Sequence, residues 1–365
     1  MLRVALVSPY SLAVPGGVQN HVLSLVPALG DLGVDATVLA PCDGVDAAGF
    51  GVPVVSLGRS LPVPANGSTA RIGLNPAGVY RLRRALGDFD VVHVHEPLVP
   101  GVGLAAAWQK RLPSVGTFHA ASDGGYWPYR AFNSLLGVAW RRLNVRTAVS
   151  EAALERVRPY FDGPVEIVPN GFDAARFADA VALPERANAP GPVLLFLGRD
   201  EPRKGLDVMR HAFRRVRAVA GDVSLWLAGP GTERVDDPGT LAFGGVDDAT
   251  LASLYVSADI FCAPARFGES FGIVLLEAMA AGAAVVASAI DGYAAVARDG
   301  AEALLVTPGD DAALGDAIVR MLADPGLRER LTAAGRARAG EFDWRALAPR
   351  VAALYEQALA TGTRS

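Results

Sequence analysis

Two glutamates stand eight residues apart in the segment "ARFGESFGIVLLEAMAAG". Glu269 lies in a loop before an apolar helical pattern, and Glu277 lies five residues beyond Gly272, roughly 7 Å along the helix. Between the glutamates, Ser270 and Phe271 join Gly272 in offering backbone amides at the predicted helix N-terminus, which favours an anion. A phosphate bound there has a carboxylate on each side, and carboxylates bind vicinal hydroxyls well. The alternative is that Glu277 is an ordinary exposed helix residue and that Glu269 is a partner of the helix dipole.

Cationic and glycine-rich loops follow two other predicted strands. In "GRDEPRKG", Arg199 and Lys204 flank a proline-containing loop. Two fixed cations suit a diphosphate, whose charge grows as it leaves. The alternative is a solvated turn whose ion pairs involve Arg199, Asp200, Glu201, Arg203 and Lys204. Near the N-terminus, "PGG" places Gly17 at the start of a helix, where backbone amides approach a ligand closely.

Histidines raise the question of a metal. "HVHEP" puts His93 and His95 on one face of a strand, but no third ligand follows at close spacing. "DFD" at 88–90 resembles an aspartate pair that holds a divalent cation in another class of sugar transferases, yet it leads straight into a strand. We therefore expect no metal and no required cofactor. His119 ends the run "SVGTFH" and so lies at a strand tip, where ligand-binding residues commonly come from.

These residues are spaced along alternating strand and helix patterns. Buried strands are predicted at 2–8, 34–40, 89–95, 114–119 and 145–150, with helical patterns between them, and the alternation restarts after residue 190. The expected fold class is α/β, with two Rossmann-like doubly wound parallel sheets and an interdomain cleft. The expected domains are 1–170 and 171–345, followed by a C-terminal helix at 346–365 that packs back across the domain boundary.

Composition limits the classes of partner. The chain has 365 residues, enough for two domains, and 34 basic against 38 acidic residues give a net charge of −4. No nucleic-acid partner is expected from this balance. Cys42 and Cys262 form no metal-ligand spacing, which favours a reduced, cytoplasmic setting. No uncharged stretch reaches the ~18–20 residues that span a bilayer, so any membrane contact is made from the surface.

One segment suits such a contact. "NPAGVYRLRRALGDFD" places Arg81, Arg83 and Arg84 on a helix that also carries the apolar residues Val79, Leu82 and Leu86. A basic amphipathic helix can lie on anionic lipid, with each arginine adding about 1 kcal/mol. The alternative is a solvated helix face.

Taken together, "PGG", "TFH", "GRDEPRKG" and the two glutamates of "ESFGIVLLE" resemble the family-4 retaining glycosyltransferases of the GT-B fold. The resemblance spans essentially the whole chain. Within that family, "SPYSLAVPGGVQNHV", "NGSTAR" and "GESFGIVLLEAMAAG" are most similar to the phosphatidylinositol mannosyltransferases of actinobacteria. The activity that this resemblance implies is transfer of mannose from GDP-mannose to phosphatidyl-myo-inositol or a similar lipid, at the cytoplasmic face of the membrane.

The resemblance also implies roles for individual residues, with Arg199, Lys204, Glu269 and His119 as the catalytic set. The donor diphosphate is assigned to Gly17, Arg199, Lys204, Ser270, Phe271, Gly272 and Ile273. The ribose is assigned to Glu277, the hexose to Glu269 and His119, and the base to Val246 and Asp248. The acceptor is assigned to Tyr10, Gln19, Ser68 and Arg71. Retention in this family needs no enzyme carboxylate as nucleophile.

Several positions depart from the subfamily pattern. Polar or aromatic residues expected near the acceptor are replaced by Ala65, Leu98, Ala120 and Ala121, and a lysine expected near the base is replaced by Leu251. These changes leave two alternatives open: the same fold with a UDP-sugar or a soluble acceptor, and a non-catalytic sugar-nucleotide-binding membrane scaffold. Protein partners and oligomeric state are not predicted.

Overall fold

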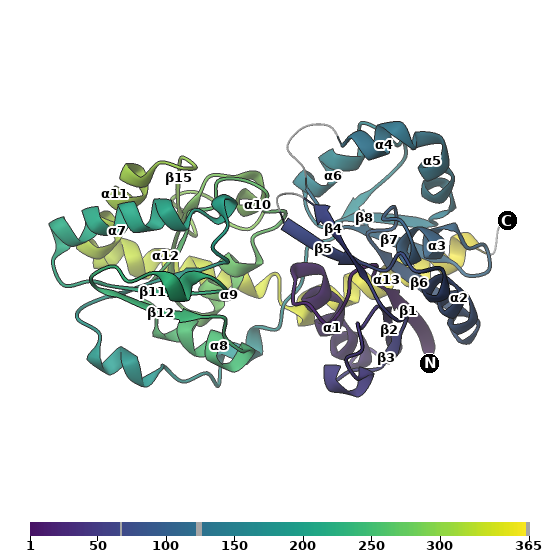
Figure 1. Cartoon of the computed structure of the whole chain (residues 1–365), viewed down its shortest axis with the longest axis horizontal. Coiled ribbons are helices and arrows are strands. Elements are labelled where there is room, and N and C mark those ends of the chain that lie inside the picture. The colour runs from purple at the N-terminus through teal and green to yellow at the C-terminus, as the bar shows by residue number, and fades with distance from the viewer. Residues whose placement is uncertain (66–67, 122–125, 363–365) are drawn as a thin grey trace. The chain divides into compact units, whose positions relative to one another are not determined.

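The computed structural model describes residues 1–65, 68–121 and 126–362, and the chain forms two compact units. The first unit comprises Met1–Phe172 and Trp344–Ser365, and the second comprises Asp173–Asp343. The expected boundaries lie two residues from these divisions. The C-terminal segment therefore belongs to the unit that contains the N-terminus (Figure 1).

A seven-stranded parallel sheet forms the centre of the first unit, in the order β3-β2-β1-β6-β7-β8-β9. The strands are β1 (Leu2–Val7), β2 (Val34–Ala40), β3 (Val54–Ser56), β6 (Val91–His95), β7 (Ser114–Phe118), β8 (Val145–Ala148) and β9 (Glu166–Ile167). Strands β6 and β7 are buried along their whole length, as expected for a parallel sheet covered on both faces. Because β1, β6 and β7 are neighbours, their carboxyl ends bring three separate loops together.

Helices cover both faces of this sheet. They are α1 (Gly17–Gly30), α2 (Pro76–Ala85), α3 (Val102–Trp108), α4 (Trp127–Ala131), α5 (Asn133–Arg142), α6 (Glu151–Val157) and α13 (Trp344–Gly362). One core cluster joins α2 and α3 to the sheet through Leu82, Leu86, Val102 and Ala106. Helices α1 and α13 contact each other, and α13 also reaches β6, β7 and β8.

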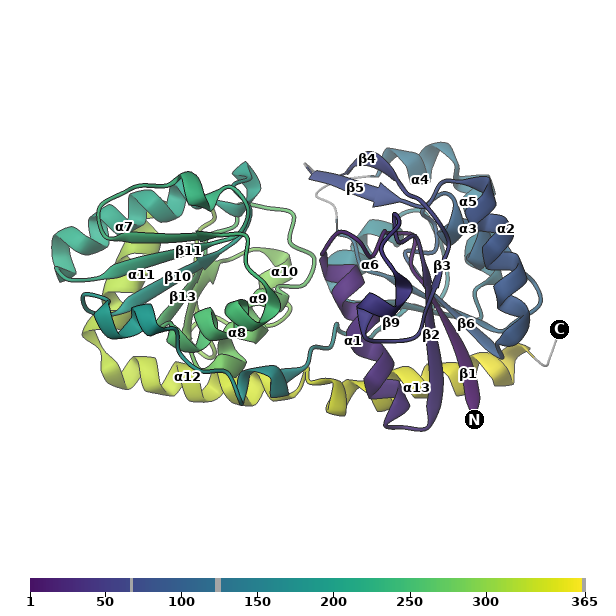
Figure 2. The ribbon, with the colours of Figure 1, turned by 60° about the horizontal axis from the view of Figure 1, so that its bottom comes forward.

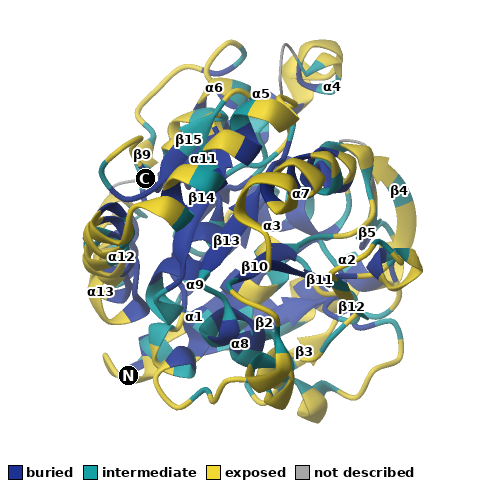
Figure 3. Cartoon of the chain, turned by 90° about the vertical axis from the view of Figure 1, so that its left-hand side faces the viewer, coloured by how far each residue is buried: buried dark blue, intermediate teal, exposed yellow. Residues whose placement is uncertain are grey.

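The second unit holds a six-stranded parallel sheet in the order β12-β11-β10-β13-β14-β15. The strands are β10 (Val193–Leu197), β11 (Ser224–Ala228), β12 (Thr240–Gly244), β13 (Ile260–Ala263), β14 (Ala284–Ser288) and β15 (Leu304–Val306). The helices are α7 (Leu206–Ala220), α8 (Asp248–Ser257), α9 (Ile273–Ala281), α10 (Asp291–Ala294), α11 (Asp311–Ala323) and α12 (Pro325–Gly340). Helices α8 and α9 lie on the face of the sheet opposite to α7 (Figure 2). The inner strands β11, β13 and β14 are buried, while the outer faces of α7 and α12 are exposed (Figure 3).

The doubly wound α/β prediction is therefore confirmed for each unit. The antiparallel hairpin of β4 (Leu61–Ala65) and β5 (Ser68–Ile72) was not predicted, because Pro62 and Pro64 argue against a strand. Its two strands form a separate two-stranded sheet, so the proline residues remove no ladder bond from the main sheet. Among the described residues, no helix combines the length and the low charge needed to cross a membrane.

Candidate functional site

The cationic loop of the second unit begins where β10 ends. The loop turns through a short 3₁₀ helix, Pro202–Lys204, before α7. The Lys204 Nζ atom lies 2.6 Å from Glu269 Oε1, and Arg203 Nη1 lies 2.9 Å from the same oxygen. Arg203 Nε also contacts Glu201. Lys204 and Glu269, two of the predicted catalytic residues, therefore lie in contact, with Arg203 as a second cation that the sequence did not single out.

Arg199 is placed differently. It is exposed, and within the described part of the chain its guanidinium has no ion-pair partner. Its neighbour Asp200 pairs with Arg234 instead. The alternative of a turn held by its own ion pairs is therefore only partly correct. Arg203 pairs with Glu201 inside the turn, but Arg203 and Lys204 also bind Glu269, which lies in the loop between β13 and α9. Arg199 remains available to bind a ligand.

The backbone before α9 is fixed by two glycines. Gly272 caps the helix in a left-handed conformation, with φ of +78°, and Ile273 is the first helical residue. A Cβ at Gly292, on α10, would lie 1.9 Å from the carbonyl oxygen of Glu269. This close approach holds the loop from Glu269 to Phe271 directly against α10. The amides of Ser270 to Ile273 therefore lie at the positive end of α9, as predicted from the sequence.

Glu277 lies on α9 in a largely enclosed position, with 12% of its side chain exposed. The Tyr255 hydroxyl, on α8, donates to Glu277 Oε2 over 2.9 Å. Arg176 Nη1 lies 3.5 Å from Glu277 Oε1. Burial raises the pKa of the Glu277 carboxyl, and Arg176 and Tyr255 oppose that rise. The alternative of an ordinary exposed helix residue is therefore wrong for Glu277.

The two residues assigned to the base flank the start of α8. Val246 precedes the helix and Asp248 is its first residue, which is exposed. The negative charge of Asp248 contributes to the raised pKa of Glu277, after the larger effect of burial. Leu251, the departure noted in the sequence, lies on the same helix.

In the first unit, His119 follows β7 and is buried. Its Nε2 atom lies 2.9 Å from His95 Nδ1, at the end of β6. Glu96 adopts φ of +53° and its Oε1 accepts hydrogen bonds from the amides of His119 and Ala120, over 2.7 and 2.6 Å. One buried carboxylate therefore ties the tips of two adjacent strands together and fixes the backbone of His119.

A third imidazole completes a buried cluster. His21, on α1, lies 4.8 Å from His119 and 5.3 Å from His95 between ring centroids. One ligand atom from each of the three lies within 4.8 Å of the others, which supplies the third ligand that the sequence did not show. His95 and His119, however, use their facing nitrogens in a mutual hydrogen bond. His93 bonds Tyr355 and Thr117 through its two nitrogens, so it serves the fold.

Burial decides the charge of these histidines. It lowers the pKa of His119 to about 3, that of His93 to about 3, and that of His21 and His95 well below the usual value. The cluster is therefore neutral near pH 7. A neutral His119 offers one hydrogen-bond donor or acceptor and no positive charge.

The residues assigned to the acceptor lie near the start of α1 and the hairpin. Gly17, which is assigned to the donor diphosphate and not to the acceptor, is the first residue of α1, and a Cβ there would meet nothing within 4 Å. Gln19 Nε2 donates to the Ser11 carbonyl, and Tyr10 bridges Ile72 of β5. Arg71 pairs with Asp43 over 3.1 Å. The side chain of Ser68 lies outside the described residues.

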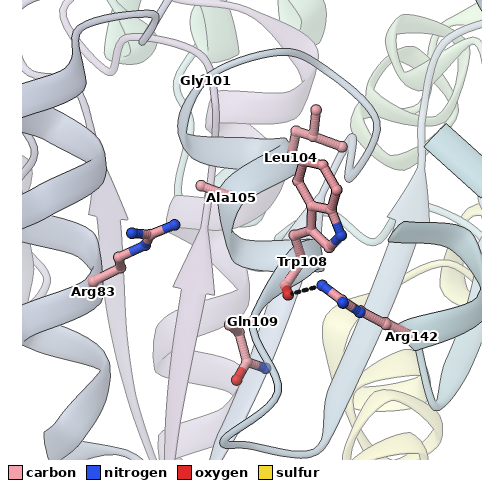
Figure 4. A pocket seen from close by; sticks show the side chains of 7 residues that line it. All are labelled: Arg83, Gly101, Leu104, Ala105, Trp108, Gln109 and Arg142. Carbon is pink, nitrogen blue, oxygen red and sulfur yellow. Dashed lines mark hydrogen bonds between the residues drawn. The ribbon is translucent and has the colours of Figure 1, made fainter. Parts of the chain in front are cut away.

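Helix α2 exposes its three arginines, Arg81, Arg83 and Arg84. The predicted apolar face of this helix is not free, because Leu82 and Leu86 belong to the core cluster. That part of the amphipathic prediction is wrong for Leu82 and Leu86, whereas Tyr80 on the same helix is exposed together with the three arginines. Arg83 also faces a pocket of about 350 Å³, which is lined by Gly101, Leu104, Ala105, Trp108, Gln109 and Arg142 (Figure 4).

This pocket is separate from the residues described above. It lies at the last turns of α2, α3 and α5, near the N-terminal ends of the strands that follow, whereas His119 lies at a carboxyl end. Arg142 Nη1 donates to the Trp108 carbonyl, which fixes one wall (Figure 4). No residue of the predicted donor or acceptor set lines the pocket.

Comparison with known proteins gives the site its context. Residues 15–176 match the model described as Glycosyltransferase Family 4, and residues 191–324 match Glycosyl transferases group 1. The chain is 40% identical to a phosphatidyl-myo-inositol mannosyltransferase of Mycobacterium leprae, covering 100% of this chain and 99% of the relative. It is 39% identical to the protein of the same name from Mycolicibacterium smegmatis, covering 100% and 96%.

The fold has solved counterparts. The structure of Anabaena Alr3699/HepE in complex with UDP and glucose superposes with a TM-score of 0.77 at 19% identity, covering 98% of this chain and 100% of that one. At that identity the likeness concerns the fold alone. The full-length sequence identity and the two family matches agree with the resemblance seen in the motifs, and this chain belongs to the family-4 glycosyltransferases of the GT-B fold.

Proposed function

We propose that this glycosyltransferase transfers mannose from GDP-mannose, with retention of configuration, to phosphatidyl-myo-inositol or a similar lipid. The observation that carries the proposal is the 40% identity over the full chain to a phosphatidyl-myo-inositol mannosyltransferase. The site residues add support, since the cations, the helix N-terminus and both glutamates occur together in the second unit.

In this proposal the second unit binds the donor. The diphosphate is bound by Arg199, Lys204 and the amides that begin at Ser270. Lys204 is neutralised by Glu269 when no donor is bound, so an arriving diphosphate offers it a second anionic partner. Once Lys204 turns to the phosphate, Glu269 keeps Arg203 as its partner and gains capacity to accept hydrogen bonds from the hexose.

The chemistry that follows relies on charge stabilisation. As the sugar–phosphate bond breaks, charge develops on the diphosphate, and fixed cations and amides stabilise it without reorganisation. The imidazole of His119, whose pKa burial lowers to about 3, is neutral near pH 7 and so can act only as a hydrogen-bonding group. We assign no nucleophilic carboxylate, and the leaving diphosphate takes the proton of the acceptor hydroxyl. No metal and no cofactor are required in this scheme.

The acceptor and the location follow from the first unit. Tyr10, Gln19, Ser68 and Arg71 are assigned to the acceptor head group. The exposed arginines of α2 are assigned to anionic lipid, as a peripheral contact at the cytoplasmic face of the membrane. Since Leu82 and Leu86 are buried in the core, the exposed arginines dominate this contact, which therefore weakens with salt.

A second candidate is the same transfer reaction with another nucleotide sugar or a soluble acceptor. Leu251, in place of a lysine near the base, and Leu98, in place of a polar residue near the acceptor, favour it. A non-catalytic scaffold is less well supported, because a chain that had lost catalysis has no reason to keep Lys204 and Glu269 in contact.

The test is a donor panel with product identification. Purified protein is mixed with GDP-mannose, UDP-sugars and mixed bacterial lipids, and the products are identified by mass spectrometry. A hexosylated phosphatidylinositol formed from GDP-mannose supports the proposal. Products formed only from a UDP-sugar, with GDP-mannose inert, end the mannose assignment, and no product from any donor supports the scaffold.

A further inference from the structure

Arg176 lies beside Glu277 at the predicted nucleoside end of the donor site, and no role has been assigned to it above. It belongs to the 3₁₀ helix η3 (Ala174–Phe177) of the second unit. Phe177 packs edge-on against Tyr255, with ring centroids 5.7 Å apart, and the Arg176 guanidinium lies 5.1 Å from the Phe177 ring. The short helix is thus anchored against α8 in a way that presents Arg176 to α9.

The hydrogen bonds of Glu277 are unevenly distributed. Oε2 accepts the Tyr255 hydroxyl at 2.9 Å, whereas Oε1 faces Arg176 Nη1 at the longer distance of 3.5 Å. Oε1 therefore keeps capacity to accept a hydrogen bond from a ligand. On the other side, Arg176 Nη2 is buried and has no hydrogen-bond partner among the described residues. A buried guanidinium nitrogen without a partner is costly, which points to a ligand atom that satisfies it.

A free acceptor thus lies beside a free donor. A vicinal diol fits this pair, because one hydroxyl donates to the carboxylate while a hydroxyl oxygen accepts from the guanidinium. We propose that Arg176 is a ribose-positioning residue of the donor site, acting both through Glu277, whose Oε1 it faces, and directly through Nη2. This inference rests on the proposed function, since it takes the nucleoside diphosphate as the ligand.

The charges around Glu277 agree with this role. Asp248 and Tyr255 face it from α8 and Arg176 faces it from η3. Burial and Asp248 raise the pKa of the carboxyl, and Arg176 is the positive charge that opposes them. Without Arg176 the carboxyl takes up a proton at higher pH, and a protonated carboxyl accepts hydroxyl hydrogen bonds poorly.

The experiment is calorimetric titration of the full chain with GDP, 2′-deoxy-GDP and inorganic pyrophosphate. Arg176→Ala is expected to weaken GDP binding about tenfold, the size of one hydrogen bond to a charged group, while pyrophosphate binding stays unchanged. The preference for GDP over 2′-deoxy-GDP should largely disappear. Lys204→Ala should show the opposite pattern and weaken GDP and pyrophosphate alike.

Two further variants separate the parts of the role. Arg176→Lys keeps the charge but removes Nη2, so it should lose the preference for GDP over 2′-deoxy-GDP while its GDP binding keeps the wild-type pH dependence. In Arg176→Ala, GDP affinity should begin to fall at a higher pH than in wild type as the solution is acidified. Arg215→Ala, which removes an exposed ion pair with Asp316 on the same unit, is the matched control and should change nothing.

Several outcomes overturn the inference. If Arg176→Ala binds GDP with the affinity of wild type, Arg176 has no role in binding the ribose, and the proposed function is unaffected. Equal losses of GDP and pyrophosphate affinity in Arg176→Ala would place the effect at the phosphates or in the fold, and also contradict it. Wild type that binds neither GDP nor UDP overturns the donor assignment itself, and the role of Arg176 with it.

Discussion

Lys204, Arg203 and Glu269 form one charge cluster at the heart of the donor assignment. Glu269 Oε1 accepts from both cations, and all three side chains are less than one-fifth exposed. Glu201 also pairs with Arg203, so the two cations face two carboxylates when no donor is bound, and a diphosphate must draw Lys204 away from Glu269. The net gain from Lys204 is therefore smaller than its full interaction with phosphate, while Arg199 has no such competitor among the described residues.

Replacing Lys204 or Arg199 tests whether these two residues bind the diphosphate. Lys204→Ala and Arg199→Ala should each weaken GDP binding by ~1.5–3 kcal/mol, the range for hydrogen bonds to charged groups. Because Lys204 also binds Glu269, the loss of GDP binding free energy in Lys204→Ala should lie at the lower end of this range. Titration calorimetry measures both, with Arg215→Ala as a surface control. GDP affinity that is unchanged in both variants would refute the diphosphate roles.

Glu96 fixes the backbone at His119 and Ala120. It occupies a left-handed conformation that few residues other than glycine adopt, and its carboxylate accepts two consecutive amides. Glu96→Ala should lower kcat on the order of 10²-fold, the cost of a misplaced group, with little change in GDP affinity. Glu96→Gln keeps an acceptor oxygen and should recover much of the loss.

Steady-state kinetics measures kcat, and calorimetric titration with GDP measures the affinity for GDP in the same variants. The Ala variant leaves two buried amides without a partner, so its thermal unfolding is followed in parallel. A Glu96→Ala enzyme that turns over like wild type would show that the strand tips hold His119 without the carboxylate.

At the scale of elements, the loop before α9 depends on how closely α10 approaches it. A methyl group at Gly292 would overlap the Glu269 carbonyl and crowd the Phe271 amide at 3.1 Å, and both are backbone atoms that cannot rotate away. Gly292→Ala should therefore displace the loop and weaken GDP binding at least about tenfold, as the loss of a charged hydrogen bond does. Calorimetry and thermal unfolding together measure this.

The matched control is Gly30→Ala on α1. A Cβ there meets nothing within 4 Å, and the backbone is not left-handed. That variant should bind GDP and unfold as wild type does. Normal GDP affinity in Gly292→Ala would mean that the amides before α9 do not hold the diphosphate.

Over the whole molecule, the buried histidines link stability to pH. The folded-state pKa values of His21, His93, His95 and His119 lie below the usual value of 6.5. The unfolded chain therefore binds more protons than the folded chain between pH 6.5 and about 3. Stability is fully present above pH 6.5 and is lost as pH falls through this window, by up to about 1.36 kcal/mol per pH unit for each histidine.

Thermal unfolding between pH 7 and pH 5 isolates this effect, because carboxylates titrate mostly below that range. The unfolding midpoint should fall steadily as the solution is acidified. His211, on α7, is exposed, so His211→Gln should follow the same profile as wild type. A midpoint that stays constant across this range would mean that the four histidines are accessible to protons in the folded chain.

Much of this fold can be predicted from the sequence, because parallel strands buried on both faces read as continuous apolar runs such as "VVHVH" and "VLLFL". Glu269 and Glu277 were identifiable since both belong to one loop and helix. Arg176, Glu96 and His21 were not identifiable, because their partners lie on other elements. Glu96 and His119, for example, meet only because β6 and β7 are neighbours in the folded sheet, which the sequence does not show. The contact of Arg203 with Glu269 could not be predicted, because the same turn holds four other charged residues.

The most direct measurement of the central claim is transfer of radiolabelled mannose from GDP-mannose to a bacterial lipid extract, by wild type and by Glu269→Ala. The account predicts labelled lipid with wild type and almost none with Glu269→Ala, although both bind GDP. Equal labelling by the two proteins, or no labelling by wild type while a UDP-sugar is transferred, would contradict it.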